Sequence, residues 1–150
     1  MKVRELMASR PISCRDSATL GEAGRLMWEH DIGFLPVLDG KDALLGVVTD
    51  RDGFMAAFFE DRPIGQIPVR NAMSTYVASV LPDAEVDEAE LTMSDFQVHR
   101  LPVVEDGKLV GVISLNDIAR KAAGEANEVL EEEVALTLGA IAQPRHAGAA

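Results

Sequence analysis

The sequence is poor in cysteine, aromatic residues and basic residues, and these shortages exclude several classes of structure and function. A single cysteine, Cys14, excludes an intramolecular disulfide, and the three histidines His30, His99 and His146 show no metal-ligand spacing with it. We therefore expect no metal site. The 14 Lys and Arg residues against 25 Asp and Glu residues give a net charge of -11, which makes binding to nucleic acid or to an anionic membrane unfavourable.

Long hydrophobic runs and common catalytic loops are also missing. The apolar stretches fall far short of the roughly 20 residues that a membrane-spanning helix needs. The first residues, MKVRELMASRP, lack the apolar centre of a secretory signal, so we expect a soluble cytoplasmic protein without a membrane partner. The sequence has no G-x-x-x-x-G-K-[ST] loop and no G-x-G-x-x-G loop, and we expect that the protein is not an enzyme.

What the sequence does contain is an internal repeat. Residues 33–54, GFLPVLDGKDALLGVVTDRDGF, return as residues 99–119, HRLPVVEDGKLVGVISLNDIA. Residues before the central turn are displaced by 66 positions, as from Leu35 to Leu101, and residues after it by 65, as from Gly46 to Gly111. An offset that slips by one residue only in a turn is hard to produce by chance, so the duplication is real.

Each copy has the pattern of a helix, two strands joined by a tight turn, and a second helix, behind a short extended lead-in segment. Thr19 followed by Glu22 is a capping-box pattern at the start of the first helix. The strands LPVL and LLGVVT, with their counterparts LPVV and LVGVIS, are short apolar runs rich in valine and bounded by Gly and Asp. The helix faces expected in the core carry Leu20, Ala23, Met27, Val86, Ala89 and Met93.

The repeat also predicts the domain boundaries. Repeat 1 spans residues 1–60, a short linker with Pro63, Gly65 and Pro68 spans 61–68, and repeat 2 spans 69–123. Residues 124–150 are expected to form an amphipathic helix followed by a frayed tail, which begins near residue 143. The residues predicted to share the apolar stripe of that helix are Leu130, Val134, Leu138 and Ile141. The run Glu131 to Glu133 is expected to be its solvated face.

The most specific motif is a hydroxyl residue at the end of the second strand, followed three positions later by aspartate. It occurs as Thr49 with Asp52 and as Ser114 with Asp117. One interpretation is structural, because the hydroxyl can cap the next helix and the acid can complete a capping box. The other is functional, because an aspartate in the first helical turn can accept hydrogen bonds from both hydroxyls of a ribose, and the free amides there suit phosphate. The two interpretations are compatible.

With this motif, the LPVV strand and the GVIS strand end, residues 1–123 resemble a tandem pair of CBS domains, the Bateman module. The resemblance implies an α/β (α+β) fold in which two β-α-β-β-α repeats pack with pseudo-two-fold symmetry, here followed by a C-terminal helix. It implies two clefts between the repeats that bind an adenosine-containing small molecule such as AMP, ADP, ATP or S-adenosylmethionine. No cofactor is required.

In the family each cleft is built crosswise, with the Ser/Thr-x-x-Asp motif from one copy and the lead-in strand and pre-LPVV residues from the other. The resemblance implies that the aspartates hold ribose and that the lead-in strands enclose adenine. Cleft one then consists of Thr49, Arg51, Asp52, Val77, Ala78, His99 and Arg100. Cleft two consists of Ile12, Ser13, Gly33, Phe34, Ser114, Asn116 and Asp117.

The two clefts are predicted to differ in their preference for phosphate. Cleft one has Arg51 and Arg100, whose guanidinium groups match phosphate, whereas cleft two offers Asn116 and Phe34. Two alternatives stay open: Arg100 as one half of a surface ion pair, and Phe34 as a residue packed in the core. His99 is expected to be a polar neighbour of the cleft without a catalytic role.

Two hypotheses of function follow. The leading one is a regulatory, ligand-sensing module that binds an adenine nucleotide or other adenosyl ligand between its repeats and modulates a partner, unidentified by the sequence, or its own assembly. The alternative is a constitutive, non-catalytic interaction protein with empty clefts, whose contact surface is the C-terminal helix with Leu130 and Leu138. Since similar pairs associate as dimers, we expect a homodimer.

Overall fold

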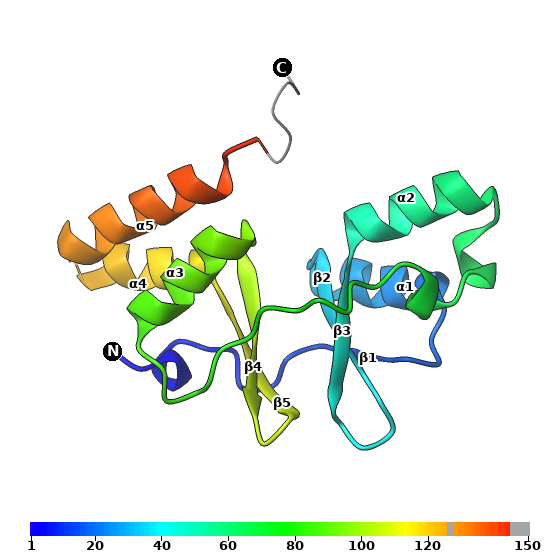
Figure 1. Ribbon diagram of the computed structural model, residues 1–150, viewed down its shortest axis with the longest axis horizontal. Helices are drawn as coiled ribbons and strands as arrows, with labels where there is room; N and C mark the ends of the chain where they lie inside the picture. The colour runs from blue at the N-terminus through cyan, green and yellow to red at the C-terminus, as the bar shows by residue number, and fades with distance from the viewer. Residues whose placement is uncertain (126–127, 145–150) are drawn as a thin grey trace. The chain divides into compact units, whose positions relative to one another are not determined.

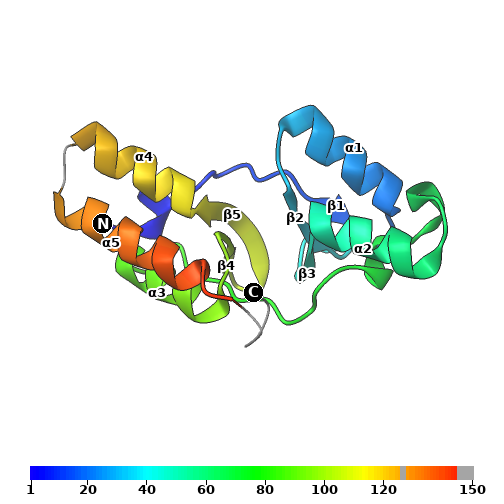
Figure 2. The same cartoon turned by 90° about the horizontal axis from the view of Figure 1, so that it is seen from above.

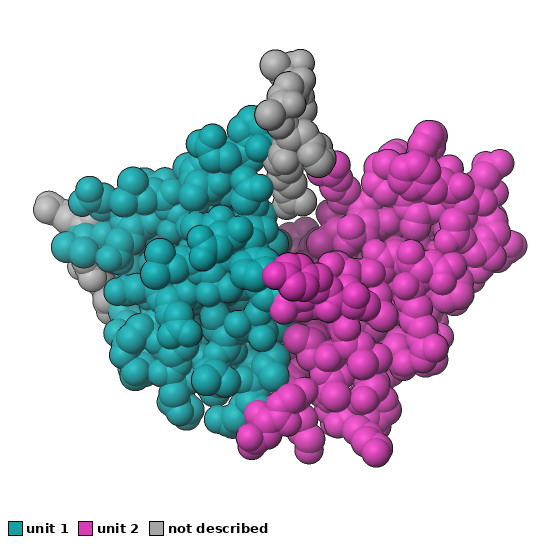
Figure 3. Space-filling model, viewed as in Figure 1, with its two compact units in different colours: residues 1–9, 78–105, 110–150 teal, residues 10–77, 106–109 magenta. Residues whose placement is uncertain are grey.

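The computed structural model describes residues 1–125 and 128–144, which fold into two compact units (Figure 3). Unit 2 consists of residues 10–77 and 106–109 and holds the helices and strands of the first repeat. Unit 1 consists of residues 1–9, 78–105 and the chain from residue 110 onward, with most of the second repeat and the C-terminal helix. Most of the predicted frayed tail, residues 145–150, lies outside the described residues.

Unit 2 contains a three-stranded sheet with two α-helices (Figure 1). The short strand β1 runs parallel to β2, which pairs antiparallel with β3 through a tight turn. Phe34 pairs with Thr49 at one end of this hairpin and Val37 with Gly46 near the other. The elements of unit 2 are β1 (Cys14–Arg15), α1 (Leu20–His30), β2 (Phe34–Leu38), β3 (Leu44–Thr49), α2 (Asp50–Glu60), and the 3-10 helices η2 (Ile64–Gln66) and η3 (Val69–Asn71).

Unit 1 repeats this plan and adds one helix. The strands β4 and β5 form the hairpin, and Val80 makes an isolated parallel bridge to Val103, as Cys14 pairs with Val37 in unit 2. The elements of unit 1 are η1 (Val3–Glu5), α3 (Val86–Phe96), β4 (Arg100–Glu105), β5 (Lys108–Ser114), α4 (Leu115–Glu125) and α5 (Glu128–Ile141). The order of elements confirms the predicted β-α-β-β-α repeats and the mixed α/β fold.

Local sequence explains where these elements begin and turn. The Thr19 hydroxyl accepts the backbone N–H of Glu22 at 3.2 Å, and the Glu22 carboxylate accepts the Thr19 N–H at 2.8 Å, so the predicted capping box starts α1. In the second hairpin, Asp106 and Gly107 have positive φ angles of 50° and 77°. A tight turn with this left-handed backbone favours Asp and Gly and matches the twist of the two strands.

The first residues of each lead-in segment belong to the unit formed by the other repeat. Residues 1–9, which begin the first repeat, belong to unit 1, where Val3 is fully buried in the core. Residues 69–77, which begin the second repeat, belong to unit 2, where Val69 is fully buried in the other core. All six helix-face residues predicted for the cores are buried there, which confirms that prediction. The compact units therefore do not coincide with the repeats read along the sequence.

The C-terminal helix α5 packs on α3 and α4, as two perpendicular views show (Figures 1 and 2). The predicted stripe is wrong at Leu138, which is 49% exposed, whereas Leu130 and Ile141 are buried and Thr137 takes the inward position between them. The reason is the helical period. Thr137 is seven residues from Leu130 and lies within about 20° of it around the helix axis, whereas Leu138 is eight residues away and lies about 80° from it. In the described part of the chain, no helix is long and apolar enough to cross a membrane.

Candidate functional site

The end of β3 and the start of α2 form the first copy of the Ser/Thr-x-x-Asp motif. The Thr49 hydroxyl accepts the backbone N–H of Asp52 at 3.2 Å, and Oδ2 of Asp52 accepts the Thr49 N–H at 2.9 Å. This reciprocal pair is the predicted capping box, and it fixes the Asp52 carboxylate at the strand end. In the described part of the chain, Oδ1 of Asp52 accepts no hydrogen bond, so this oxygen is available to a ligand.

The second copy of the motif, at the end of β5, has the same geometry and one additional partner. Oδ2 of Asp117 accepts the Ser114 N–H at 2.9 Å and the Ser114 hydroxyl at 2.5 Å, and the Asp117 N–H donates to the Ser114 hydroxyl at 3.2 Å. The other oxygen, Oδ1, is paired with the guanidinium of Arg120 on the next turn of α4. A ribose at Asp117 would therefore compete with Arg120, whereas a ribose at Asp52 would not.

Two arginines predicted to bind phosphate are free of ion pairs in the described part of the chain. Arg51 is exposed in the first turn of α2, and Arg100 is half-buried at the start of β4. Neither guanidinium lies within ion-pair distance of a described carboxylate. By contrast, Arg4, Arg15 and Arg70 each form an ion pair with an aspartate. The alternative in which Arg100 is one half of a surface ion pair thus finds no partner among these residues.

Each predicted cleft takes residues from both units. Cleft one takes four residues from unit 2 and three from unit 1. Those from unit 2 are Thr49, Arg51, Asp52 and Val77, and those from unit 1 are Ala78, His99 and Arg100. Of cleft two, Ile12, Ser13, Gly33 and Phe34 belong to unit 2, and the motif residues belong to unit 1. The crosswise composition of both clefts stays a prediction.

Inside each unit, the structure brings together residues that were assigned to different clefts. Phe34 pairs with Thr49, and the Gly33 carbonyl accepts the N–H of Asp50 at 3.2 Å. The His99 carbonyl accepts the N–H of Leu115 at 2.9 Å in the same way. Each unit thus presents the start of one strand, the end of the next and the first turn of a helix at a single edge.

Burial of the remaining predicted residues fits a surface site. Ile12 and Ala78, which occupy matching positions in the two lead-in segments, are half-buried against the cores of their own units. Phe34 is half-buried and is not part of the apolar core of unit 2, which disfavours the packing alternative for it. His99 and Asn116 are exposed, and Ser13 and Val77 are half-buried.

The sequence analysis did not predict an open apolar groove between α1 and α2 in unit 2. The groove encloses about 570 Å³, and its rim carries Trp28, which is 88% exposed, and Phe54. Thr49 and Asp50 are also among the residues that line it. The signal in the sequence is the spacing of Phe54 and Phe58, one helical turn apart in a helix that buries none of its residues.

The fold and these motifs place the protein in a known class. A family model described as "CBS domain" matches residues 3–56 and 64–124, which together cover both repeats. The chain therefore belongs to the CBS-domain family and contains a tandem CBS pair, as the sequence resemblance predicts.

Three individual proteins illustrate the similarity. The CBS domain-containing protein YhcV of Bacillus subtilis is 34% identical over 117 residues, which cover 78% of this chain and 82% of YhcV. The crystal structure of AcuB from Vibrio cholerae shares 33% identity and a TM-score of 0.76, covering 88% of this chain and 96% of that one. The CBS domain pair of protein MJ0100, in complex with 5′-methylthioadenosine and S-adenosyl-L-methionine, shares 25% identity and a TM-score of 0.74, covering 83% and 98%.

Proposed function

We propose that this protein is a non-catalytic regulatory module that binds an adenosine-containing ligand between its two repeats. The observation that carries the proposal is the duplicated motif, in which Oδ1 of Asp52 accepts no hydrogen bond from any described residue. A carboxylate held in this way can accept hydrogen bonds from a ribose diol. The similarity to the CBS pair of MJ0100, whose structure contains two adenosyl compounds, supports the ligand class.

The charges of the described residues favour a ligand with phosphate in cleft one. With a net charge of -11, the chain repels anions at long range, so an anionic ligand needs local cations. Arg51 and Arg100 have no carboxylate partner in the described part of the chain, and a free guanidinium binds phosphate through two parallel hydrogen bonds. We therefore propose AMP, ADP or ATP for cleft one, and weaker ribose binding at Asp117, where Arg120 competes.

Regulation by such a module requires only that the ligand favours one arrangement of the two repeats. A coupling free energy of about 1 to 3 kcal/mol between ligand and partner is enough for a useful signal. Because the proposed clefts take residues from both units, ligand binding would restrict how the units move relative to each other. The readout would be a change in affinity for a partner protein or in self-association.

The test is isothermal titration of the full chain with AMP, ADP, ATP and S-adenosylmethionine. Asp52→Ala should abolish binding of the preferred nucleotide, and Asp117→Ala should leave most of it, which makes the two variants a matched pair. Arg100→Ala should weaken nucleotides by about tenfold or more and leave S-adenosylmethionine nearly unchanged, because only the former carry phosphate. Unchanged nucleotide binding by Asp52→Ala would exclude cleft one.

A melting curve for each variant is the necessary control, because Asp52 also caps α2. Loss of a cap costs about 1 kcal/mol of stability. Asp52→Asn keeps an oxygen that can cap the helix but removes the charge, so it should melt close to the wild type and still bind more weakly. Binding that is lost only in variants with a lowered Tm would indicate unfolding and would count against the ribose role.

A second function, constitutive self-association, is favoured by the aromatic surface of unit 2. We propose that a second copy of this chain docks on the aromatic face, defined as Trp28, Phe54, Phe58 and Phe59. All four side chains are exposed, and Phe59 is 76% exposed. Leu130, assigned to the contact surface in the sequence hypothesis, is buried and is not available for such a contact, whereas Leu138 is 49% exposed.

The aromatic face has the two properties that a symmetric dimer needs. In a two-fold dimer the same patch serves both partners, so it must supply projecting groups and a hollow that receives them. Phe58 and Phe59 form a projecting edge-to-face pair with ring centroids 5.3 Å apart, and the groove beside Trp28 is an apolar hollow. Aromatic side chains are also the residues that contribute most to protein interfaces.

Sedimentation of wild-type and variant chains tests this arrangement. Phe58→Asp and Phe59→Asp should convert a dimer into a monomer, while Leu138→Asp, a matched change on the exposed side of α5, should leave the dimer intact. Both phenylalanines are exposed, so the variants should fold. A monomeric wild type, or a dimer that survives both changes, would contradict the aromatic face as the contact.

A further inference from the structure

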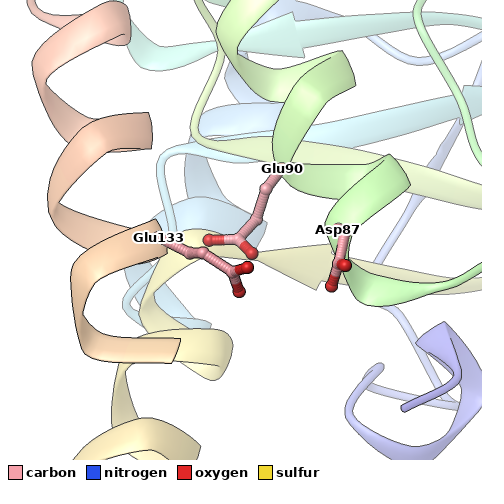
Figure 4. Close-up of side chains that lie close together, drawn as sticks. All are labelled: Asp87, Glu90 and Glu133. Carbon is pink, nitrogen blue, oxygen red and sulfur yellow. The ribbon is translucent and has the colours of Figure 1, made fainter. Parts of the chain in front are cut away.

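Three carboxylates gather between α3 and α5 in unit 1. Asp87 and Glu90 lie one turn apart on α3, and Glu133 extends toward them from α5 (Figure 4). One oxygen of each side chain lies within 4.8 Å of the corresponding oxygens of the other two. Glu133 was predicted to belong to a fully solvated helix face, but it is half-buried, whereas Glu131 and Glu132 are exposed.

Glu90 is buried without adequate partners. The residue is 4% exposed, and its Oε1 accepts one long hydrogen bond, at 3.5 Å, from the Thr137 hydroxyl on α5. Its Oε2 is buried and has no hydrogen-bond partner among the residues that the structure describes. A buried carboxylate oxygen without a partner is costly and rare, and it points to a group that this oxygen binds.

The described lining of the groove around these carboxylates supplies no balancing charge. The groove around the three carboxylates encloses about 460 Å³, and its described lining contains no lysine or arginine. Burial, followed by the charges of Glu133 and Asp87, raises the pKa of Glu90 to about 7, and only the Thr137 hydrogen bond opposes this. Three acids therefore repel one another where α5 contacts α3, unless a cation or a proton intervenes.

We propose that Asp87, Glu90 and Glu133 bind a hard divalent cation and that the bound cation links α5 to α3. The site should prefer Ca²⁺ to Mg²⁺. Oxygen-only ligand sets suit Ca²⁺, Mg²⁺ and Mn²⁺, whereas zinc in proteins is mostly held by nitrogen and sulfur. Ca²⁺ binds oxygen at about 2.4 Å, so two of its ligands can lie up to about 4.8 Å apart. Mg²⁺ demands a near-octahedral shell, keeps several waters and is held by one or two carboxylates, so three carboxylates from two helices suit the more flexible coordination of Ca²⁺ better.

The repeat provides an independent argument, because the cluster exists only where α5 is present. The offset of 66 residues places Gly21 and Gly24 of α1 at the positions of Asp87 and Glu90. The first repeat has no counterpart of α5, and it carries no carboxylate at either position. The two acids on α3 therefore occur together with the helix that supplies the third ligand.

The test measures cation binding and its effect on α5 in the full chain. After treatment with a chelator, addition of 1 to 10 mM Ca²⁺ should raise Tm by about 3 °C or more and protect the amides of α5 from hydrogen exchange. Sodium chloride at equal ionic strength should not have this effect. Mg²⁺ should have a smaller effect at the same concentration, and isothermal titration should give one Ca²⁺ per chain.

Isosteric variants show whether the site is the cause. Glu90→Gln and Glu133→Gln should each abolish the rise in Tm and the protection of α5, whereas the matched change Glu131→Gln, on the exposed face of the same helix, should keep both. Glu90→Gln should fold well, since it removes a buried charge. The proposal would be overturned if Ca²⁺ had no effect on the wild type, or if its effect persisted in Glu90→Gln and Glu133→Gln. An equal response to Mg²⁺ would overturn the preference for Ca²⁺.

Discussion

The two repeats share a fold but differ in what covers their helices. In unit 1, α5 packs against both α3 and α4 and buries Leu130 and Ile141 in the core. In unit 2, α1 contacts the short 3-10 helix η2, no α-helix in the described part of the chain packs on α1 and α2 as α5 packs on α3 and α4, and α2 buries none of its residues. The same supersecondary unit thus has a closed helix layer in one copy and an open, aromatic one in the other. Two repeats with the same order of elements can therefore expose different helix surfaces.

The difference extends to single positions of the paired helices. Where α3 carries Asp87 and Glu90, α1 carries Gly21 and Gly24. At Gly21 an added Cβ would lie 3.0 Å from the backbone of Gly65, because the 3-10 helix η2 approaches α1 closely. The glycines of α1 thus leave room for the 3-10 helix η2 to pack closely, while the acids of α3 face the helix α5. The comparison separates positions that maintain the shared fold from positions that specialise one repeat.

The largest expected effect comes from removing the contacts of α5. Leu130→Ala should lower the free energy of unfolding by about 2 to 4 kcal/mol, because it leaves a cavity in a buried cluster. Leu138→Ala, on the exposed side of the same helix, should change it by less than about 0.5 kcal/mol. Urea unfolding followed by circular dichroism measures both. Equal losses would mean that α5 does not cover unit 1 as described.

The paired strand glycines offer a second comparison. A Cβ at Gly46 would lie 2.6 Å from the Ser74 carbonyl oxygen, which belongs to the rigid backbone. A Cβ at Gly111 would lie 2.6 Å from the sulfur of Met7, which can rotate away. We expect Gly46→Ala to cost about 2 kcal/mol and Gly111→Ala about 1 kcal/mol, measured by thermal unfolding. The reverse order would show that the Met7 side chain is held more tightly than the backbone near Ser74.

Glu90 gives the closed helix layer a pH dependence in which stability falls as the pH rises. Its pKa is raised from 4.5 to about 7 in the folded chain, so the folded state binds more protons than the unfolded state between these values. In the absence of divalent cations, this contribution to stability is present below about pH 4.5 and is lost as the pH rises through about 7, with a slope of at most about 1.4 kcal/mol per pH unit.

Unfolding in urea at several pH values, with a chelator present, measures this contribution. Glu90→Gln should remove the decline in stability between pH 5 and 7, because glutamine does not titrate. Glu131→Gln is the control, since Glu131 is exposed on the same helix and should leave the decline in place. A wild-type stability that does not change across this window would contradict a raised pKa for Glu90.

The smallest and most symmetric effect concerns the helix caps at the candidate site. Thr49→Ala and Ser114→Ala should each lower stability by about 1 kcal/mol, because each hydroxyl accepts one backbone N–H at the start of a helix. The two losses should be similar, since the capping geometry is the same in both repeats. Thermal unfolding at pH 7 measures them. A loss confined to one repeat would show that the caps are not equivalent.

Most of the fold could be predicted from the sequence, because local patterns determine it. The Thr19 and Glu22 capping box, the turn at Asp106 and Gly107, and the alternation of helices and strands all depend on residues close in sequence. The stripe of α5 was predicted incorrectly at Leu138, because apolar residues occur on both sides of that helix. Only the packing against α3 and α4 decides which side is buried.

The candidate site was predictable in part. Repetition identified Asp52 and Asp117 as motif residues, and the structure assigns both to capping boxes at strand ends. That Asp117 is paired with Arg120 while Asp52 keeps a free oxygen depends on side-chain conformations, which no motif specifies. The acids on α3 and α5 escaped notice because their ligand spacing is not local: Glu90 and Glu133 are 43 residues apart.

The sequence by itself therefore determined the repeat, its secondary structure and the family, because each of these is encoded by neighbouring residues and by a comparison of the two copies. Only the tertiary structure decided that residues 1–9 and 69–77 belong to the unit of the other repeat, that α5 covers the helices of unit 1, and that three acids meet beside Thr137. These features arise from contacts between segments distant in sequence. Such contacts depend on packing and burial, which hydrophobic patterns alone do not fix.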